Sequence, residues 1–386
     1  MALFPPTIKP PVRRFLSRNP IVVEYMSGYH QELNFRMECE LAVYNSVGAY
    51  MGTHIQRGVP DSAGLFGFHL HSIAHSFLKP ALPAKNGISW GDTAMVNVKV
   101  KIREYWGEPA TYKRIALEAS HFVFLGGVDP RKTSTDWFAK IKGYQTWAPN
   151  NKLVGPAQED YLTLFTSLAA YSTVYLHAKV VYDDGSFGEY MLLTANNVLN
   201  TVLHFPAGFE QLGLHLKQPA KRALSYTLYA SNNADPAALA GRNDERTYLL
   251  DYAHYPTART FLYLNSLGGW ETLRCTGSFK ENWDEEHETA QRMVPYNQTS
   301  QISPFFSFNH SARTSIKGNT GRQLSRTWYR HLKEFTLSRE VYEITPAGRV
   351  KVILKPGKYQ IGEDRNTEMS LDFDYSYAHE THSYTP

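Results

Sequence analysis

Apolar and polar residues alternate one by one along several stretches of the chain, and this period of two most constrains the fold. Between Leu33 and Val43 every second residue is apolar, and Asn, Arg and Glu fill most positions between them. The same alternation runs through Ala94–Ile102, Val174–Tyr182, Leu273–Phe279 and Leu371–Tyr375. Because successive side chains of a strand point to opposite faces, these stretches predict half-buried antiparallel strands.

The alternation also predicts which side chains face solvent. The outward sets are Asn97, Lys99, Lys101 and Arg103; His177 and Lys179; Arg274, Thr276 and Ser278; and Asp372 and Asp374. Helical spacing is scarce, and short helices are expected only at Ser72–Leu78, Ala195–Val202 and Leu324–Phe335. We therefore expect a mainly β fold of two to three tandem immunoglobulin- or fibronectin-like β-sandwich domains with short helices.

A short phrase recurs along the chain. Phe165–Val174 aligns with Leu264–Leu273 at an offset of 264 − 165 = 99 residues, and Asn45–Tyr50 is a weaker third copy. Each copy has a polar residue, Ser, an aliphatic residue, two small residues and an aromatic one. Small residues let the backbone turn or approach a neighbour closely. We expect Tyr171 and Trp270 to be buried at equivalent corners, since about 100 residues is the size of one β-sandwich.

This spacing suggests four segments. Residues 1–12 contain Pro5, Pro6, Pro10 and Pro11 and are expected to form an extended N-terminal arm. Residues 13–151 and 152–256 are expected to form two β-sandwich domains, and residues 257–386 a β-rich C-terminal domain. The joints are short, which suits a fixed arrangement.

Composition excludes several classes of protein. Forty Lys and Arg against 36 Asp and Glu give a net charge of +4 over 386 residues, too weak to indicate nucleic-acid binding. Two cysteines, Cys39 and Cys275, exclude a disulfide framework and a multi-cysteine metal site. No stretch reaches the ~18 apolar residues of a membrane span, and no signal peptide is evident at the start. We expect a soluble protein made in the cytoplasm.

Candidate chemical motifs are weak. His69, His71 and His75 have a spacing that zinc accepts, yet ordinary histidines on a polar strand face explain them better. The acidic run Asp284–Glu288 lacks the spacing of a calcium loop and is expected to be a solvated loop. Asp372 and Asp374 share a face expected to meet solvent, and His379 and His382 lie in a tail. No catalytic, cofactor-binding or metal-ligating residue is therefore predicted, and no cofactor.

Aromatic residues are abundant, with 25 Tyr, 20 Phe and 7 Trp. Several lie near expected turns or strand ends: Tyr105, Trp106, Tyr144, Trp147, Trp283, Trp328 and Tyr329. Such side chains build protein interfaces or stack on sugars when they are exposed, and they fill cores when they are not. The sequence leaves these alternatives open.

Four features together resemble structural proteins of phages and prophages of Bacteroidota. They are the turn and amphipathic segment Val59–Leu78, the phrase Phe261–Leu273, the segment Leu332–Tyr342 and the closing strand Met369–Tyr377. Asn265–Thr272 is the most specific part. The resemblance implies a tail, tail-tip or baseplate component built from stacked β-sandwiches, and it transfers no catalytic residue.

The leading hypothesis is therefore a non-enzymatic structural subunit that is made in the host cytoplasm and located in a phage virion. Its expected partners are copies of itself in a ring-like assembly and other virion proteins, without nucleic acid and without a membrane span. Two alternatives remain: a carbohydrate-binding or adhesion module, and a glycan-active enzyme whose carboxylates need no local motif.

Overall fold

Strands make up most of the described chain, in a computed structural model that describes residues 14–128, 143–166, 172–198, 200–238, 242–291, 293, 305–322, 327–359, 369–379 and 382–384. For residues 284–286, 309–313 and 382–384 the backbone alone is described. The expectation of a mainly β, sandwich-type fold is confirmed. The described residues divide into two compact units. The first lies within Met1–Thr146, Asn150–Tyr252 and Leu264–Glu271, and the second within Trp147–Pro149, Ala253–Tyr263 and Thr272–Pro386.

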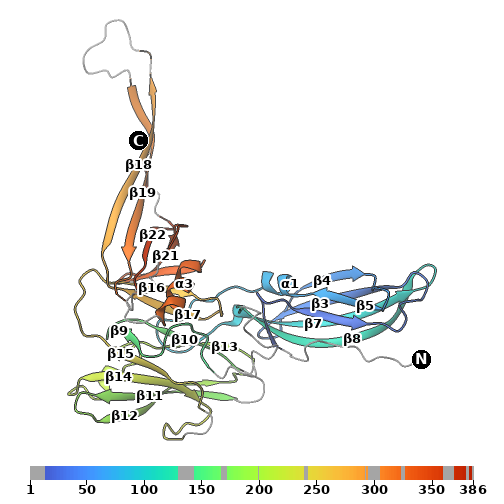
Figure 1. Ribbon diagram of the computed structural model, residues 1–386, viewed down its shortest axis with the longest axis horizontal. Coiled ribbons are helices and arrows are strands. Elements are labelled where there is room, and N and C mark those ends of the chain that lie inside the picture. Colours follow the sequence, from blue (N-terminus) through green and yellow to red (C-terminus); the bar gives the residue numbers. More distant parts are fainter. Residues whose placement is uncertain are drawn as a thin grey trace. The chain divides into compact units, whose positions relative to one another are not determined.

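Sheet A of the first unit has five strands in the order β1-β8-β7-β3-β4 (Figure 1). Their bounds are β1 Arg14–Leu16, β3 Arg36–Asn45, β4 Tyr50–Gly58, β7 Met95–Trp106 and β8 Thr111–Phe124. Alternation predicted the inner face correctly, because Met37, Cys39, Leu41 and Val43 are fully buried. β1 pairs with β8 in parallel, whereas the other neighbours are antiparallel.

A smaller layer covers the inner face of sheet A. It holds sheet B, made of β2 (Val22–Met26) and β5 (Leu65–His69), followed by helix α1 (His71–Ser76). The two layers meet closely at Gly58 of β4, where an added Cβ would lie 2.1 Å from the Phe66 ring. The short helix expected at Ser72–Leu78 is thus present, shifted by about one residue at its start.

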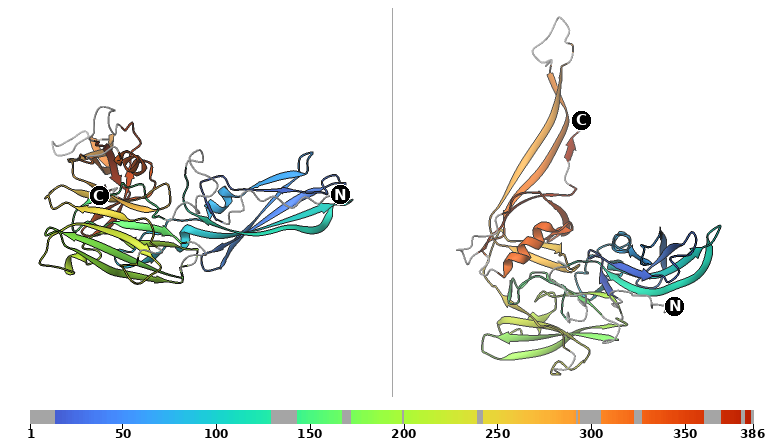
Figure 2. Two further views of the ribbon diagram at one scale, coloured as in Figure 1. Left: turned by 60° about the horizontal axis from the view of Figure 1, so that its bottom comes forward. Right: turned by 45° about the vertical axis from the view of Figure 1, so that its right-hand side comes forward.

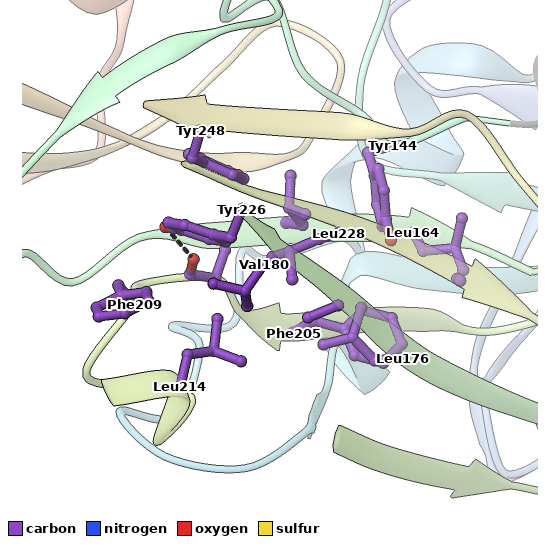
Figure 3. Packing of buried hydrophobic residues seen from close by; sticks show 14 of the residues in the cluster. Tyr144, Leu164, Leu176, Val180, Phe205, Phe209, Leu214, Tyr226, Leu228 and Tyr248 are labelled. Atoms are coloured by element: carbon purple, nitrogen blue, oxygen red, sulfur yellow. Dashed lines mark hydrogen bonds between the residues drawn. The ribbon is translucent and has the colours of Figure 1, made fainter. Parts of the chain in front are cut away.

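Two further sheets of the first unit enclose a second core, shown in Figure 3. Sheet C has the order β10-β13-β6, with bounds Tyr161–Phe165, Val202–Pro206 and Ser89–Trp90. Sheet D has the order β12-β11-β14-β15-β9, with bounds Phe187–Asn196, Thr173–Tyr182, Ala223–Ser231, Arg246–Leu250 and Lys152–Val154. Tyr226 and Tyr248 stack in this core at 4.9 Å, and the Tyr226 hydroxyl donates to the Ala207 carbonyl at 2.8 Å. Two single 3-10 turns, η1 (Asp92–Ala94) and η2 (Leu214–Leu216), lie in the connections.

Sheet E lies mostly in the second unit, with the order β17-β16-β20-β21-β22-β19-β18 and β23 paired to β19; only Leu264 of β16 and Trp270 and Glu271 of β17 fall in the first. Its strands are β16 Arg259–Leu264, β17 Trp270–Cys275, β18 Phe279–Gln291, β19 Phe305–Asn319, β20 Val341–Thr345, β21 Gly348–Leu354, β22 Asp372–Tyr377 and β23 His382–Tyr384. Helix α3 (Trp328–Leu337) covers one face through Leu332 and Phe335, and Phe335 packs on Phe261 and Phe373. This helix was expected at Leu324–Phe335, of which residues 324–326 lie outside the described residues.

Three local expectations are wrong. No helix forms over Ala195–Val202 in its described part, because Asn197 and Asn200 adopt φ values of 58° and 47°, which a right-handed helix excludes. His177 does not face solvent: it is fully buried, stacks on Tyr229 at 5.2 Å and bonds the Asn233 carbonyl at 2.8 Å. The acidic run Asp284–Glu288 is not a loop but part of β18.

The recurring phrase forms the same turn in two of its copies. In Asn45–Tyr50 and in Asn265–Trp270, the amide of the fourth residue donates to the carbonyl of the Asn, and that of the fifth to its side-chain oxygen. Gly48 and Gly268 have φ values of 86° and 84°. Trp270 is buried as expected, with 1% of its surface exposed, whereas Tyr50 is 61% exposed. The copy at Phe165–Val174 is not compared, since residues 167–171, including Ala169, Ala170 and Tyr171, lie outside the described residues.

Each of the three large sheets takes its strands from one predicted domain: sheet A from 13–151, sheet D from 152–256 and sheet E from 257–386. Sheet C combines β6 of the first segment with β10 and β13 of the second. The division at residues 151/152 and 256/257 stays a prediction, as does the arm at 1–12, which lies outside the described residues.

Candidate functional site

The long hairpin formed by β18 and β19 is the first candidate surface. The two strands pair from Phe279↔Gly318 to Gln291↔Phe305. β22 joins β19 only at Ile316–Asn319, and β23 joins it at His310–Ala312. Beyond these pairs, among the described strands, β18 and β19 have only each other. Figure 1 and the right-hand view of Figure 2 show the hairpin extending past the other strands of sheet E.

Side chains along this hairpin change from buried to exposed. At its base Phe279 packs on Phe261 and Phe373, with ring centroids 6.4 and 6.3 Å away. Farther along, Trp283 is 55% exposed, Phe305 60% and Phe306 45%. Phe306 lies 5.9 Å from the Phe308 ring. Large aromatic side chains thus remain in solvent on an element that has left its own core.

Such a ribbon can take part in protein contacts in two ways. An isolated two-stranded hairpin is only marginally stable in water, so a surface that covers it gains stability for both partners. Exposed aromatic groups mark interaction surfaces on soluble proteins. β18 is also an edge strand of sheet E, and an edge strand offers unpaired backbone groups for strand addition.

A groove on the outer face of sheet A is the second candidate. It is open to solvent, has a volume of about 440 Å³ and crosses β3, β7 and β8. One cross-strand row, Ala42–Lys99–Ser120, has small residues at both ends. The next row on one side holds Tyr44, and the row on the other side holds Glu40, Lys101 and Glu118. The groove therefore arises where short side chains lie between two rows of longer ones.

Ion pairs neutralise most charges around this groove. Lys101 lies 2.9 Å from Glu118, and Arg103 binds both Glu40 and Glu38. Lys99 differs, because its ammonium lies over the Tyr44 ring, 4.5 Å from the centroid. No carboxylate of the described residues is within ion-pair distance of Lys99. Among the described residues, Lys99 is thus the charged residue of the groove lining that is not held in an ion pair.

Two buried carboxylates elsewhere are paired with an arginine of their own sheet. In sheet E, Glu343 accepts hydrogen bonds from the hydroxyls of Tyr375 and Tyr377 at 3.0 and 2.8 Å, and Arg259 lies 3.4 Å away. Burial, and then the bond to Glu343, raise the pKa of Tyr377 to about 12, so that phenol stays protonated at neutral pH. In sheet A, Arg114 binds the fully buried Glu104 at 2.5 Å. Both clusters therefore stabilise the fold at the edge of a hydrophobic core, and neither is proposed as a functional site.

The histidines singled out in the sequence do not come together. His69 is exposed at the end of β5, and its ring centroid is 6.3 Å from that of His71. His75 instead meets Ser17, with 2.9 Å between Nδ1 and Oγ. In the described part of the chain, no three His, Cys, Asp or Glu side chains are grouped so that they could hold a metal ion. His379 is exposed, and only the backbone of His382 is described.

The other candidate residues divide between core and surface. Cys39 and Cys275 are free and fully buried, and burial raises the pKa of the Cys39 thiol to about 12. Asp372 and Asp374 lie on the face opposite the buried Phe373, as expected. Tyr144 and Trp328 are buried in cores. The Trp106 ring stacks on the Tyr29 ring with 5.0 Å between centroids. The Arg330 guanidinium carbon lies 3.0 Å from the centroid of the Trp147 ring. Tyr105 is half-buried and bonds Glu38, whereas Trp283 and Tyr329 are exposed.

Sequence reasoning placed Lys99 on the outer face but missed the groove. The missing information was the register, which aligns Ala42 and Ser120 with Lys99 across three strands. The sequence held one signal for the groove, which was a small residue, such as Ala42, at an outward-facing position of a strand.

None of the helices in the described residues is long and apolar enough to cross a membrane. No known family model matches this chain, and no curated protein is similar to it.

Proposed function

We propose that this protein is a non-enzymatic structural subunit that acts through protein–protein assembly, and that the assembly is the tail, tail-tip or baseplate of a phage virion. The long hairpin carries the proposal of assembly. It presents Trp283, Phe305 and Phe306 to solvent on a ribbon with no core of its own. The phage class rests on the sequence resemblance alone.

The physical argument is one of unmet burial. Moving apolar surface out of water contributes roughly 25 cal/mol per Å², and an aromatic side chain buries about 150–250 Å². Since these rings are 45–60% exposed, each offers roughly 2–4 kcal/mol of association energy before the entropic costs of binding. Copies of the same chain are the partner that is always present, and head-to-tail contacts between copies form a ring when the rotation from one subunit to the next closes.

The test measures mass in solution at increasing protein concentration. We expect the full-length chain to associate, and the double variant Phe305→Ser/Phe306→Ser to require at least about tenfold more protein for the same association. Phe187→Ser is the matched control, because Phe187 is also an exposed phenylalanine, 61% accessible, but lies in the β11–β12 hairpin. Equal association of all three proteins would contradict the role of the long hairpin.

The phage assignment has a separate test. Purified particles should contain the chain in a fixed number of copies relative to the other particle proteins, as quantified by mass spectrometry. Its absence from particles, combined with normal self-association, would leave an assembly protein of another kind.

A further inference from the structure

We propose that the sheet A groove binds a saccharide that bears carboxylate groups. This inference is independent of the assembly role, since the groove lies on β3, β7 and β8 of the first unit, and the long hairpin belongs to the second. The proposal assigns a ligand site to the outer face of sheet A. The fold does not depend on an open groove on this face.

Shape is the first support. About 440 Å³ lies within the size range of small-molecule sites, and the groove is formed by side chains of paired strands rather than by loops. Ala42 and Ser120 keep its floor low on either side of Lys99. The Lys99 ammonium lies over the Tyr44 ring, and both side chains line the groove.

Charge selects the ligand class. Glu40 and Glu118 are already neutralised by Arg103 and Lys101, so a ligand cation has no uncompensated carboxylate to meet. Lys99 has a π face as its neighbour and no carboxylate among the described residues. A carboxylate placed beside Lys99 would form a charge-assisted bond, the stronger kind of hydrogen bond.

The surrounding groups favour a saccharide over a peptide. β3 and β7 are hydrogen-bonded on both sides, so no backbone edge is free beneath the groove for an added peptide strand. A ligand meets side chains instead: the Ser120 hydroxyl, the paired carboxylates of Glu40 and Glu118, and the Tyr44 ring. Sugar hydroxyls both donate and accept hydrogen bonds, which suits this mixture, and Tyr44 supplies an apolar wall for a sugar ring.

The test uses calorimetric titration of the full chain with three acidic probes: oligomers of galacturonic acid, of glucuronic acid with N-acetylglucosamine, and of sialic acid. The methyl ester of the galacturonic acid oligomer keeps the sugars and removes the charge. The esters of the other two probes are prepared in the same way. We expect at least one acidic probe to bind and its methyl ester to bind much more weakly. The affinity of the acidic probe should fall when the salt concentration is raised from about 0.05 to 0.5 M.

Variants locate the binding. Lys99→Gln should weaken it by at least about tenfold, which is the loss expected for one charge-assisted bond. Lys113→Gln is the matched control, because Lys113 also lies over an aromatic ring of sheet A, that of Trp106 at 5.9 Å, but outside the groove. Ala42→Gln and Ser120→Gln fill the floor independently, so a folding defect in one leaves the other informative. Circular dichroism and thermal melting check that each variant is folded.

Three results would overturn the proposal. The first is no binding of any acidic probe, and the second is binding that Lys99→Gln leaves unchanged. The third is equal binding of an oligoglutamate peptide with the same number of carboxylates, which would assign the groove to acidic peptides instead. None of these results bears on self-association, so the two proposals fail separately.

Discussion

At the scale of single residues, a buried histidine gives the first unit a dependence on pH. His204 is 1% exposed, and its Nδ1 lies 3.0 Å from the Thr163 hydroxyl, which also accepts from the Trp270 amide. A hydroxyl both donates and accepts, so this one can give its proton to Nδ1 of the neutral ring. Burial lowers the pKa of His204 to about 4. A second buried histidine, His177, has its pKa lowered by burial as well.

We expect acid to destabilise the protein through His204. In the unfolded chain the imidazole takes up its proton near pH 6.5, but in the folded chain only near pH 4. The unfolded state therefore binds more protons between these values, and the free energy of unfolding should fall as the pH falls through this window. The loss is at most about 3 kcal/mol. Urea unfolding at pH 7, 6, 5 and 4 measures it.

His204→Gln keeps a polar group beside Thr163 and removes the titration. Its free energy of unfolding should be lower than that of the parent at pH 7 and should decline less toward pH 4. Parallel curves for the two proteins would show that His204 does not control this part of the pH dependence.

The two copies of the recurring turn allow a matched comparison of glycines. Gly48 and Gly268 have the same φ within 2°, yet a Cβ on Gly48 meets nothing within 4 Å, while on Gly268 it lies 1.9 Å from the Leu125 carbonyl oxygen. Gly48→Ala should cost only the left-handed strain, about 1–2 kcal/mol. Gly268→Ala should cost at least about 2 kcal/mol more, because backbone must move. Equal costs in denaturant unfolding would disprove the close packing of this turn.

At the scale of elements, the sequence predicts strands that are buried on one face. It does not predict the burial of a side chain when a residue of a neighbouring strand determines that burial. β3, β7 and β22 were predicted because their buried and exposed sides differ in polarity. His177 breaks the rule, since Tyr229 on the next strand covers it, and only the register of β11 and β14 reveals that neighbour. β18 is exposed on both faces along its described outer length, so it carries no alternation and its acidic run resembles a loop.

The candidate sites were less predictable than the fold. Trp283 was noted as a surface aromatic, but Phe305 and Phe306 follow one another without the alternation that indicates a strand. The groove depends on Ala42, Lys99 and Ser120. These residues are far apart in the sequence and become neighbours only because β3, β7 and β8 pair. Pairing over such distances leaves no local pattern to read.

The long hairpin should be removable without loss of the fold. Replacing residues 287–310 by Asn-Gly would join Glu286 to Ser311, which already face each other across the ladder, through a two-residue turn. The base contacts of Phe279 remain, so the melting temperature should stay close to that of the parent. Self-association should weaken strongly, because Phe305 and Phe306 are removed and Trp283 alone remains. A large drop in melting temperature would mean that the hairpin stabilises the second unit itself.

At the scale of the whole molecule, assembly should bury more surface than a transient contact does. We expect above ~2,000 Å² per subunit, the range of lasting interfaces. Deleting residues 1–12 should leave thermal stability nearly unchanged and reduce incorporation into particles, because a proline-rich segment builds no core. Earlier melting of the shortened chain would make these residues part of a core, and normal incorporation would exclude a docking role.

The parallel edge strands β1 and β9 also bear on how the chain folds while it is being synthesised. β1 covers the edge of β8 across 122 − 14 = 108 residues, and β9 covers β15 across 248 − 152 = 96. At 5–20 residues per second, each cover strand leaves the ribosome about 5–20 s before the edge that it closes. β1 and β9 have three residues each. Strands this short are poor partners for β-pairing with another chain before β8 and β15 have been synthesised. When β8 and β15 emerge, their partners are already there, so the last three residues of each strand, Phe122–Phe124 and Tyr248–Leu250, can pair without waiting open to a neighbouring nascent chain.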